Sequence, residues 1–233
     1  MIRGMELLLL SNSRTVSGFL VDYLEEIRAF AGTARKAAFI PFASVQRPWP
    51  EFTRMVGDAL QHFDLRMVEG PDDLRDAEMV VVSGGNTFQL LKECRNRELL
   101  APLKKKILSG TRYLGWSAGS NLACPTIKTT NDMPIVDPGG LEALGLLPFQ
   151  LNPHYTSQSI PGHQGETRDQ RLAEFAAVNP EMPVLGLPEG DWLRVSGARM
   201  ELKGPHEAVW FHGANRVSVK PGTLFAPSIP SQP

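Results

Sequence analysis

The sequence predicts an α/β fold in which a mostly parallel β-sheet carries helices on both faces and an antiparallel ribbon is added near the C-terminus. In the first half of the chain, short apolar runs alternate with segments whose apolar residues recur at helical spacing. This alternation is typical of βαβ units, which build a parallel sheet. In the second half, short strand-like segments follow one another with glycine-containing turns between them, which is typical of antiparallel strands.

Each apolar run of the first half predicts a buried strand, and each helical pattern predicts a helix. The predicted strands cover residues 5–10, 37–41, 65–68, 79–83 and 112–116. A first helix is predicted from the spacing of Phe19, Leu20, Tyr23, Leu24, Ile27 and Phe30. The next is predicted from Phe52, Met55, Val56, Leu60 and Phe63, and two more begin near Thr87 and Leu99.

The second half begins with a segment, residues 124–165, that is rich in proline, glycine and asparagine. A helix is predicted over residues 168–178, and short strands are predicted near 184–187, 192–195, 200–202 and 208–211. The tail from Pro221 is rich in proline and serine and is expected to be frayed. With neither an internal repeat nor a clear linker, residues 1–220 are predicted to form a single domain, followed by the tail over 221–233.

Composition and charge exclude several classes of function. The 233 residues carry a formal net charge of −1, which argues against nucleic-acid partners and against binding to a membrane surface. The two cysteines, Cys94 and Cys124, are too few for a disulfide framework or a zinc site. The short apolar run at the N-terminus is followed by no small-residue cleavage site, and no run is long enough to span a membrane. We therefore expect a cytoplasmic protein.

Glycine and proline are the enriched residue types. The chain has 21 glycines and 19 prolines, about 17% together compared with roughly 12% in average proteins. This share is too low for a low-complexity chain, so it indicates many tight turns on an ordered scaffold. Functional residues are often carried by such loops.

The most informative turn is Gly115-Trp116-Ser117-Ala118-Gly119. It follows a predicted strand and precedes a small-residue stretch that can begin a helix, which is the context of a nucleophile elbow. In such an elbow the serine hydroxyl is presented above the sheet, and the helix N-terminus directs N–H groups at developing negative charge. Ser117 is therefore a candidate nucleophile, and the alternative is a glycine-rich turn with an incidental serine.

A second glycine turn, Ser83-Gly84-Gly85-Asn86-Thr87, follows the predicted strand at 79–83. Gly84 and Gly85 let the backbone approach a substrate closely, so their N–H groups, with that of Ala118, are candidates for an oxyanion hole. Asn86 is a candidate substrate contact. The turn lacks a Walker lysine and a complete G-x-G-x-x-G pattern, which argues against nucleotide binding.

A serine nucleophile requires a histidine base, and the chain has five histidines. His154, in Asn152-Pro153-His154-Tyr155, follows an apolar stretch at which a strand end would hold the imidazole rigidly, and it is the preferred candidate. The alternatives lie on a predicted helix, in a loop after Pro161-Gly162 and in the late strand region; they are His62, His163, His206 and His212.

The third member of a triad would be a carboxylate that orients the imidazole. Asp132 and Glu189 are the two main candidates, and Asp137 and Asp191 are weaker ones. All four lie on turns rich in proline or glycine. The residues alone do not choose between Asp132 and Glu189.

Several long blocks resemble the peptidase E family of α-aspartyl dipeptidases. They are MELLLLSNS at 5–13, SGGNTFQLLKE at 83–93 and GWSAGSNLACPTIKTTNDMPIVDP at 115–138, followed in the same order by NPHY at 152–155, GETRDQR at 165–171 and GLPEGDW at 186–192. The resemblance covers nearly all of the chain except the extreme termini. One departure is Ser120, where alanine is expected.

The resemblance implies a flavodoxin-like fold related to class I glutamine amidotransferases, which have a cysteine at the elbow. It implies that Ser117 is the nucleophile and His154 the base, with Asp132 or Glu189 as the third member. It further implies hydrolysis of dipeptides with an N-terminal aspartate, without a metal or other cofactor. The rival interpretations are a cyanophycinase-like exopeptidase acting on β-aspartyl links and a non-catalytic binding protein of the same fold.

The expected substrate carries a carboxylate, and a guanidinium group matches a carboxylate with two parallel hydrogen bonds. Arg168 and Arg171 lie at the start of the predicted helix after His154. Arg168 is the preferred specificity residue, and the alternative is that both arginines are solvated, with Arg171 paired to Asp169 or Glu174. The expected partner is a small dipeptide, and a homodimer is compatible with the sequence.

Overall fold

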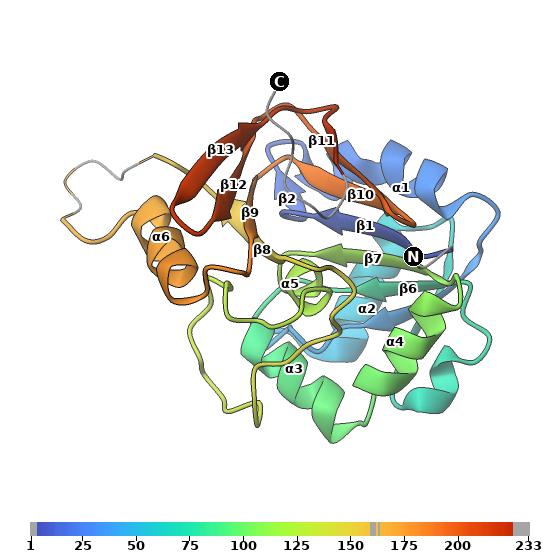
Figure 1. Ribbon diagram of the computed structural model, residues 1–233. Coiled ribbons are helices and arrows are strands. Elements are labelled where there is room, and N and C mark those ends of the chain that lie inside the picture. The colour runs from blue at the N-terminus through green and yellow to red at the C-terminus, as the bar shows by residue number, and fades with distance from the viewer. Residues whose placement is uncertain (1–3, 159–161, 163, 226–233) are drawn as a thin grey trace.

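The computed structural model describes residues 4–158, 162 and 164–225, and Figure 1 shows its helices and strands. Its centre is an eight-stranded sheet with the strand order β14-β11-β10-β1-β7-β6-β4-β5. Five neighbouring strands of this sheet run parallel. They are β1 (Glu6–Leu10), β7 (Arg112–Trp116), β6 (Met79–Val82), β4 (Lys36–Ile40) and β5 (Asp64–Met67).

The order of the parallel strands confirms the predicted flavodoxin-like sheet. If β4, β5, β6 and β7 are numbered 1 to 4 and β1 is numbered 5, the strands stand across the sheet in the order 2-1-3-4-5. This is the strand order of flavodoxin. In such sheets, ligands bind beyond the carboxyl ends of the strands, next to the point where the strand order reverses. Here that point lies between β4 and β6.

Helices cover both faces of the sheet because the buried strands are apolar on both sides. In β1, for example, Leu7 and Leu9 belong to one core cluster and Leu8 and Leu10 to the other, as the two-residue period of a strand requires. One face packs against α1 (Leu24–Ala31) and α2 (Trp49–Ala59). The other packs against α3 (Thr87–Asn96), α4 (Leu100–Leu108) and α5 (Ala118–Leu122), as Figure 1 shows.

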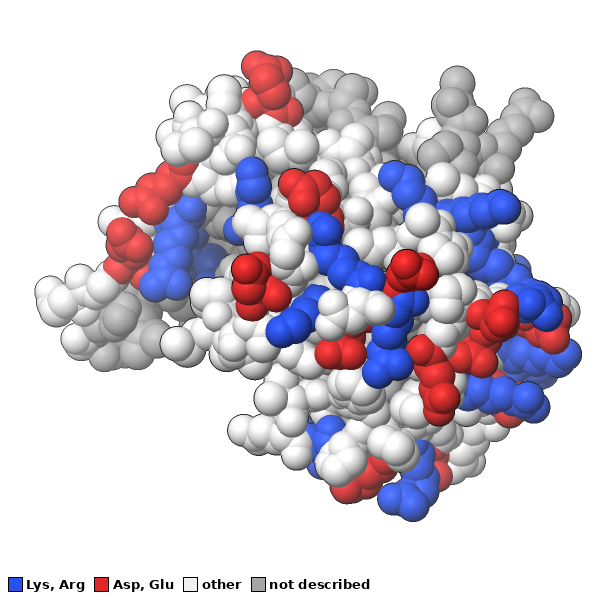
Figure 2. Space-filling model, turned by 90° about the horizontal axis from the view of Figure 1, so that it is seen from below, with Lys and Arg blue, Asp and Glu red and all other residues white. Residues whose placement is uncertain are grey.

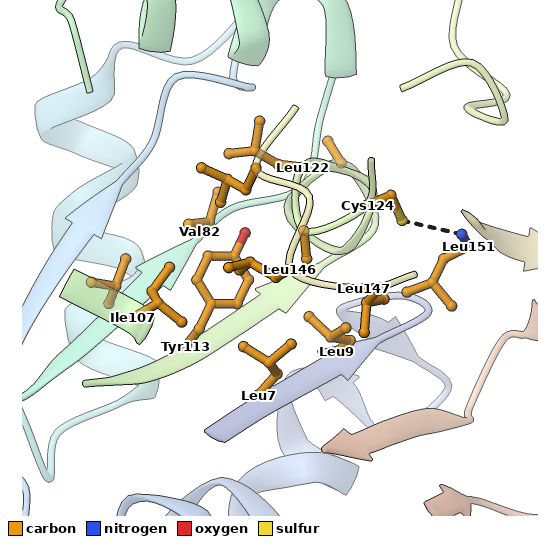
Figure 3. Packing of buried hydrophobic residues seen from close by; sticks show 14 of the residues in the cluster. Leu7, Leu9, Val82, Ile107, Tyr113, Leu122, Cys124, Leu146, Leu147 and Leu151 are labelled. Atoms are coloured by element: carbon orange, nitrogen blue, oxygen red, sulfur yellow. Dashed lines mark hydrogen bonds between the residues drawn. The ribbon is translucent and has the colours of Figure 1, made fainter. Parts of the chain in front are cut away.

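Two polar groups in the core beneath α5 are hydrogen-bonded. The Tyr113 hydroxyl donates to the Gly119 carbonyl oxygen at 2.6 Å, and Cys124 Sγ accepts from the Leu151 N–H at 3.1 Å, the bond drawn in Figure 3. Burial raises the pKa of the Cys124 and Cys94 thiols to about 12. Both cysteines are therefore held as buried, neutral thiols that pack like small apolar side chains.

The antiparallel strands of the second half are divided between two sheets, whereas the sequence predicts one ribbon. β10 (Trp192–Ser196), β11 (Arg199–Lys203) and β14 (Leu224–Phe225) extend the main sheet beyond β1. A separate four-stranded sheet has the order β13-β12-β9-β8. Its strands are β8 (Gln150–Tyr155), β9 (Val184–Pro188), β12 (Ala208–His212) and β13 (Asn215–Val219), and β8 pairs with β9 in parallel. The local pattern of a strand does not specify its partner, which is why the division is not predictable.

The first predicted helix begins later than its apolar spacing indicates. Phe19 lies in a small hairpin of β2 (Arg14–Thr15) and β3 (Gly18–Phe19), and Leu20 has a φ of 59°, which interrupts helical geometry. A 3₁₀ turn, η1 (Val21–Tyr23), then leads into α1. A second such turn, η2 (Pro71–Leu74), precedes β6. The remaining helix, α6 (Arg168–Val178), has the predicted bounds.

The C-terminal tail departs from the prediction where the structure describes it. Leu224–Phe225 forms β14 and pairs with β11, so the chain is ordered beyond the predicted end at residue 220. Residues 226–233 of the predicted frayed tail lie outside the described residues.

Figure 2 shows basic and acidic side chains interspersed on the face seen from below, without a broad area of one sign. This mixture agrees with the balanced charge of the chain. Across the described ranges of the chain, no helix has the length and apolar character needed to cross a membrane.

Candidate active site

Ser117 occupies a strained turn between β7 and α5. Its φ is 51° and its ψ is −112°, a conformation that residues other than glycine rarely adopt. The Ser117 N–H donates to the Leu10 carbonyl oxygen at 3.1 Å, which ties the turn to the end of β1. Such strain typically accumulates at functional sites, and this strand–turn–helix geometry is that of a nucleophile elbow.

The glycines on either side of Ser117 are required by close packing. A Cβ atom added to Gly115 would lie 2.7 Å from the carbonyl oxygen of Gly119. A Cβ atom on Gly119 would overlap the carbonyl oxygen of Val82 at the end of β6. The helix α5 can therefore approach β6 and β7 closely only because both residues lack a side chain.

Ser120, which replaces the expected alanine, is a buried anchor of this turn. Its hydroxyl lies 2.7 Å from the Leu10 carbonyl oxygen and 3.1 Å from the Gly115 carbonyl oxygen. The same Leu10 oxygen accepts the N–H of Ser117. The substitution thus adds a link between α5, the elbow and β1.

His154 lies on β8 with its imidazole directed at Ser117. Nε2 of His154 lies 2.9 Å from Ser117 Oγ. The residue has a φ of 56° at an irregularity in the pairing of β8 with β9. Its backbone N–H donates to the buried hydroxyl of Ser11 at 2.8 Å, and that hydroxyl donates to the Leu187 carbonyl oxygen at 2.8 Å. Ser11, which follows β1, therefore fixes the strand that carries the imidazole.

The two carboxylate candidates have different surroundings. Glu189 Oε1 lies 2.6 Å from Nδ1 of His154, on the side of the ring opposite Ser117. Asp132 Oδ2 instead accepts the N–H of Thr87 at 2.8 Å, the Thr87 hydroxyl at 2.5 Å and the Thr130 hydroxyl at 3.1 Å. The structure thus brings Ser117, His154 and Glu189 into one chain of contacts, while Asp132 holds the first turn of α3.

The other histidine and carboxylate candidates lie elsewhere. The His62 ring packs edge-on against Phe63, and His212 is the last residue of β12. Nδ1 of His206 lies 3.2 Å from Oδ1 of the fully buried Asp191. Asp137 accepts the N–H of Gly139, and His163 lies outside the described residues. Across the part of the chain that the structure describes, no group of three or more His, Cys, Asp and Glu side chains could hold a metal ion.

The predicted oxyanion groups lie beside Ser117. The position of a Cβ atom on Gly84 would be 3.0 Å from Ser117 Cβ, so the two turns are in contact. Gly85 has a φ of 139°, and a side chain there would overlap the carbonyl group of Ala43. Among the described residues, no acceptor bonds the N–H groups of Gly84, Gly85 or Ala118. These three donors are therefore free for a ligand.

Asn86 lines the same cavity, but its side chain is already engaged. Its Oδ1 caps α3 by accepting the Gln89 N–H at 3.0 Å, and its Nδ2 donates to the Met133 carbonyl oxygen at 2.9 Å. The side chain thus joins the oxyanion turn to the segment that carries Asp132.

A cavity of about 680 Å³ opens above Ser117. It is lined by Ser117, His154, Glu189, Asp132 and the Gly84–Asn86 turn, and also by Arg14, Phe19, Arg47, Phe52 and Met55. The sequence predictions miss Arg14 and Arg47. The available signal is their position, because Arg14 follows β1 and Arg47 follows β4, at the sheet edge where Ser117 follows β7.

Arg168 begins α6, is half-buried, and is not among the residues that line the cavity above Ser117. Its guanidinium donates to Oδ1 of Asn131, and Nδ2 of Asn131 donates to the Pro153 carbonyl oxygen at 2.7 Å, next to His154. Within the described residues, no carboxylate pairs with Arg168, whereas Arg171 pairs with Glu166 at 3.7 Å, not with Asp169 or Glu174. Burial and the nearby charge of Arg171 lower the pKa of Arg168.

Comparison with known protein families gives one match over most of the chain. Peptidase family S51 matches residues 7–203. Peptidase E of Salmonella paratyphi A (strain ATCC 9150 / SARB42) is 48% identical over 230 residues, covering 95% of this chain and 100% of the relative. Peptidase E of Salmonella typhimurium LT2 is 47% identical with the same coverage.

Solved structures agree on the fold. A putative peptidase E protein from Listeria monocytogenes EGD-e has a TM-score of 0.66 at 21% identity, covering 87% of this chain and 99% of that one. A peptidase from an acI-B1 actinobacterium has a TM-score of 0.63 at 17% identity, covering 96% and 98% of the two chains.

Proposed function

The chain belongs to peptidase family S51 and is a serine peptidase, and we propose that it hydrolyses dipeptides with an N-terminal aspartate, with Ser117 as the nucleophile. The observation that carries the assignment of roles is the contact chain from Ser117 Oγ through the His154 ring to Glu189, at 2.9 and 2.6 Å. In this proposal the single domain acts in the cytoplasm, where its two buried thiols stay reduced.

In the first step, Ser117 Oγ attacks the carbonyl carbon of the aspartyl residue, and Nε2 of His154 takes the hydroxyl proton. Nδ1–H of His154 donates to Glu189 Oε1, so the carboxylate holds the imidazole in the tautomer whose Nε2 can accept a proton. The carboxylate also stabilises the imidazolium that forms. Glu189 is therefore our choice for the third member, and Asp132 has a positioning role through α3.

The negative charge that develops on the carbonyl oxygen is stabilised by backbone donors. The N–H groups of Gly84, Gly85 and Ala118 are the candidates, because they adjoin Ser117 and bond to no acceptor among the described residues. Donors already fixed in position stabilise a transition state without reorganisation. Asn86 contributes by holding this turn against the Asp132 segment, and its place in the cavity keeps it a candidate substrate contact.

Collapse of the tetrahedral intermediate breaks the peptide bond, and Nε2–H of His154 gives its proton to the leaving amine. Water then attacks the aspartyl ester of Ser117, with His154 as the base. The ester bond breaks, Ser117 regains its proton and free aspartate leaves. Every proton in this cycle moves through Nε2 of one histidine.

Arg168 is our candidate for binding the aspartyl side chain. It is a half-buried cation without a carboxylate partner in the described part of the chain, and such a charge is stabilised by an anionic ligand. Its guanidinium contacts the neutral amide of Asn131, next in sequence to Asp132. A substrate carboxylate would be a stronger acceptor for it than this amide.

The proposal is tested with α-linked Asp-Leu, β-linked Asp-Leu and a fluorophosphonate serine reagent. We expect hydrolysis of the α-linked dipeptide, covalent labelling at Ser117, and loss of both in a folded Ser117→Ala variant. Preferential hydrolysis of the β-linked dipeptide would favour a cyanophycinase-like exopeptidase. Undiminished turnover by Ser117→Ala contradicts the serine assignment, and absence of both labelling and turnover in the unmodified protein would favour a binding protein.

A further inference from the structure

The cavity above Ser117 has two chemically different ends. Asp132 lies toward the α3 face of the sheet, where it contacts Thr87. The other end lies toward the α1–α2 face, where Phe19 packs edge-on against Trp116 at 6.1 Å, and Phe52 and Met55 adjoin the same core cluster. Two arginines, Arg14 and Arg47, also line this apolar end. It therefore combines apolar surface with positive charge.

We propose that Arg14 binds the C-terminal carboxylate of the dipeptide and so makes a free carboxylate on the leaving residue a determinant of specificity. The inference rests on the proposed function, because it concerns the half of the substrate that leaves. That half carries an apolar side chain in Asp-Leu and a carboxylate one residue beyond the reacting carbonyl. Since one residue spans only about 3.5 Å, a cation that binds this carboxylate has to lie in the same cavity as Ser117, and Arg14 lines that cavity.

Arg14 is favoured over Arg47 because its charge is free. Arg47 contacts Met55 Sδ, and its Nε lies 3.7 Å from Glu51 Oε1, so part of its charge is already neutralised. Arg14 is an exposed residue, and its guanidinium carbon lies 5.9 Å from the centre of the Phe19 ring. Within the described residues, no carboxylate pairs with Arg14. A guanidinium beside an aromatic ring and without a counter-charge is suited to bind a carboxylate.

The hairpin that carries Arg14 is fixed relative to Glu189. Asn12, which is buried, donates from Nδ2 to the Arg14 carbonyl oxygen at 2.5 Å. Its Oδ1 accepts the N–H of Gly190 at 2.9 Å and the hydroxyl of Tyr23 at 2.5 Å. One side chain therefore connects the proposed carboxylate-binding strand to the turn that orients His154. This link fixes the backbone of Arg14 relative to the turn that carries Glu189.

The test compares Asp-Leu with Asp-leucinamide, which differ only in the terminal carboxylate. We expect the unmodified enzyme to prefer Asp-Leu in kcat/KM by about tenfold or more, the effect of one charge-assisted contact. Arg14→Met should reduce this preference to within about threefold, by lowering kcat/KM for Asp-Leu alone. Arg14→Lys should retain part of the preference, because the positive charge remains. Arg47→Met is the matched control and should keep the full preference.

Turnover of Asp-Leu by the unmodified protein tests the proposed function separately. If the unmodified protein does not cleave this dipeptide, the proposed function fails and the inference fails with it. If it is cleaved, two results overturn the inference. One is that Arg14→Met keeps the preference for Asp-Leu over Asp-leucinamide, and the other is that Arg47→Met loses this preference. Equal losses on Asp-Leu and Asp-leucinamide in Arg14→Met also overturn it, because Arg14 would then bind the aspartyl carboxylate.

Discussion

The carboxylate of Glu189 lies 2.6 Å from Nδ1 of His154, although 62% of the Glu189 side chain is exposed to solvent. Asp132, the competing carboxylate, makes its three contacts with Thr87 and Thr130. An exposed carboxylate is screened by water, so its electrostatic effect on the imidazole is weaker than that of a buried one. Its orienting effect on the ring does not depend on burial. The two acids therefore have separable roles.

Glu189→Gln should lower kcat for Asp-Leu by about 10- to 1000-fold, less than the ~10⁴-fold effect of the matching change at a buried triad carboxylate. Its unfolding free energy should change little because the side chain is exposed. Asp132→Asn should instead lower the unfolding free energy by about 1–2 kcal/mol, since the first turn of α3 loses a charged acceptor. Steady-state kinetics and urea unfolding of both variants check this division, and the reverse pattern would assign the triad to Asp132.

Arg168→Met should lower kcat/KM for Asp-Leu by about a hundredfold and leave kcat/KM for Asn-Leu nearly unchanged. The reason is that only Asp-Leu carries the side-chain carboxylate. Arg171→Met is the matched control, since Arg171 lies on the same helix but is exposed and pairs with Glu166. We expect it to retain the preference for aspartate. Equal losses on Asp-Leu and Asn-Leu in Arg168→Met would contradict a role in recognition.

Two glycines in helices should respond to alanine in opposite directions. Gly119→Ala would place a methyl group on the Val82 carbonyl oxygen, so the unfolding free energy should fall by about 1–3 kcal/mol. Gly57, within α2, has open space at its Cβ position. Gly57→Ala should therefore raise the unfolding free energy by about 0.5–1 kcal/mol. Urea unfolding measures both values, and an unchanged or raised unfolding free energy for Gly119→Ala would refute the close packing of α5 on β6.

Continuous apolar runs made the parallel core predictable. The bounds of β7 and α6 agree with the sequence prediction, since each combines a clear period with clear ends. The pairing of the later strands was not predictable, because β9 and β10 follow one another along the chain after a single short turn and yet join different sheets. The two-residue strand that carries Arg14 is too short to produce a periodic signal.

The site was predictable as a set of residue types but not as a geometry. Ser117 and Gly84 follow strands and carry recognisable turns, so their order along the chain indicates their place at one sheet edge. The choice between Asp132 and Glu189 depends on distances across two sheets, which spacing along the chain does not encode. The positive φ of His154 is also a tertiary effect, since it occurs where β8 shifts register against β9.

Asp191 should make stability depend on pH. Burial raises its pKa from 3.8 to about 6, although the N–H and charge of His206 oppose the shift. Between these two values the folded protein binds more protons than the unfolded chain, so the unfolding free energy falls as pH rises from about 4 to 6. At about 1.4 kcal/mol per unit, the loss amounts to at most about 3 kcal/mol.

Asp191→Asn removes this titration while its Oδ1 can still accept the His206 N–H, which lies 3.2 Å from Oδ1 of Asp191. We therefore expect the variant to gain stability relative to the unmodified protein as pH rises through that range, as measured by urea unfolding at several pH values. Because other groups titrate in both proteins, the difference between the two curves isolates Asp191. A difference independent of pH would mean that the carboxyl group ionises normally despite its burial, with His206 offsetting the lost hydration.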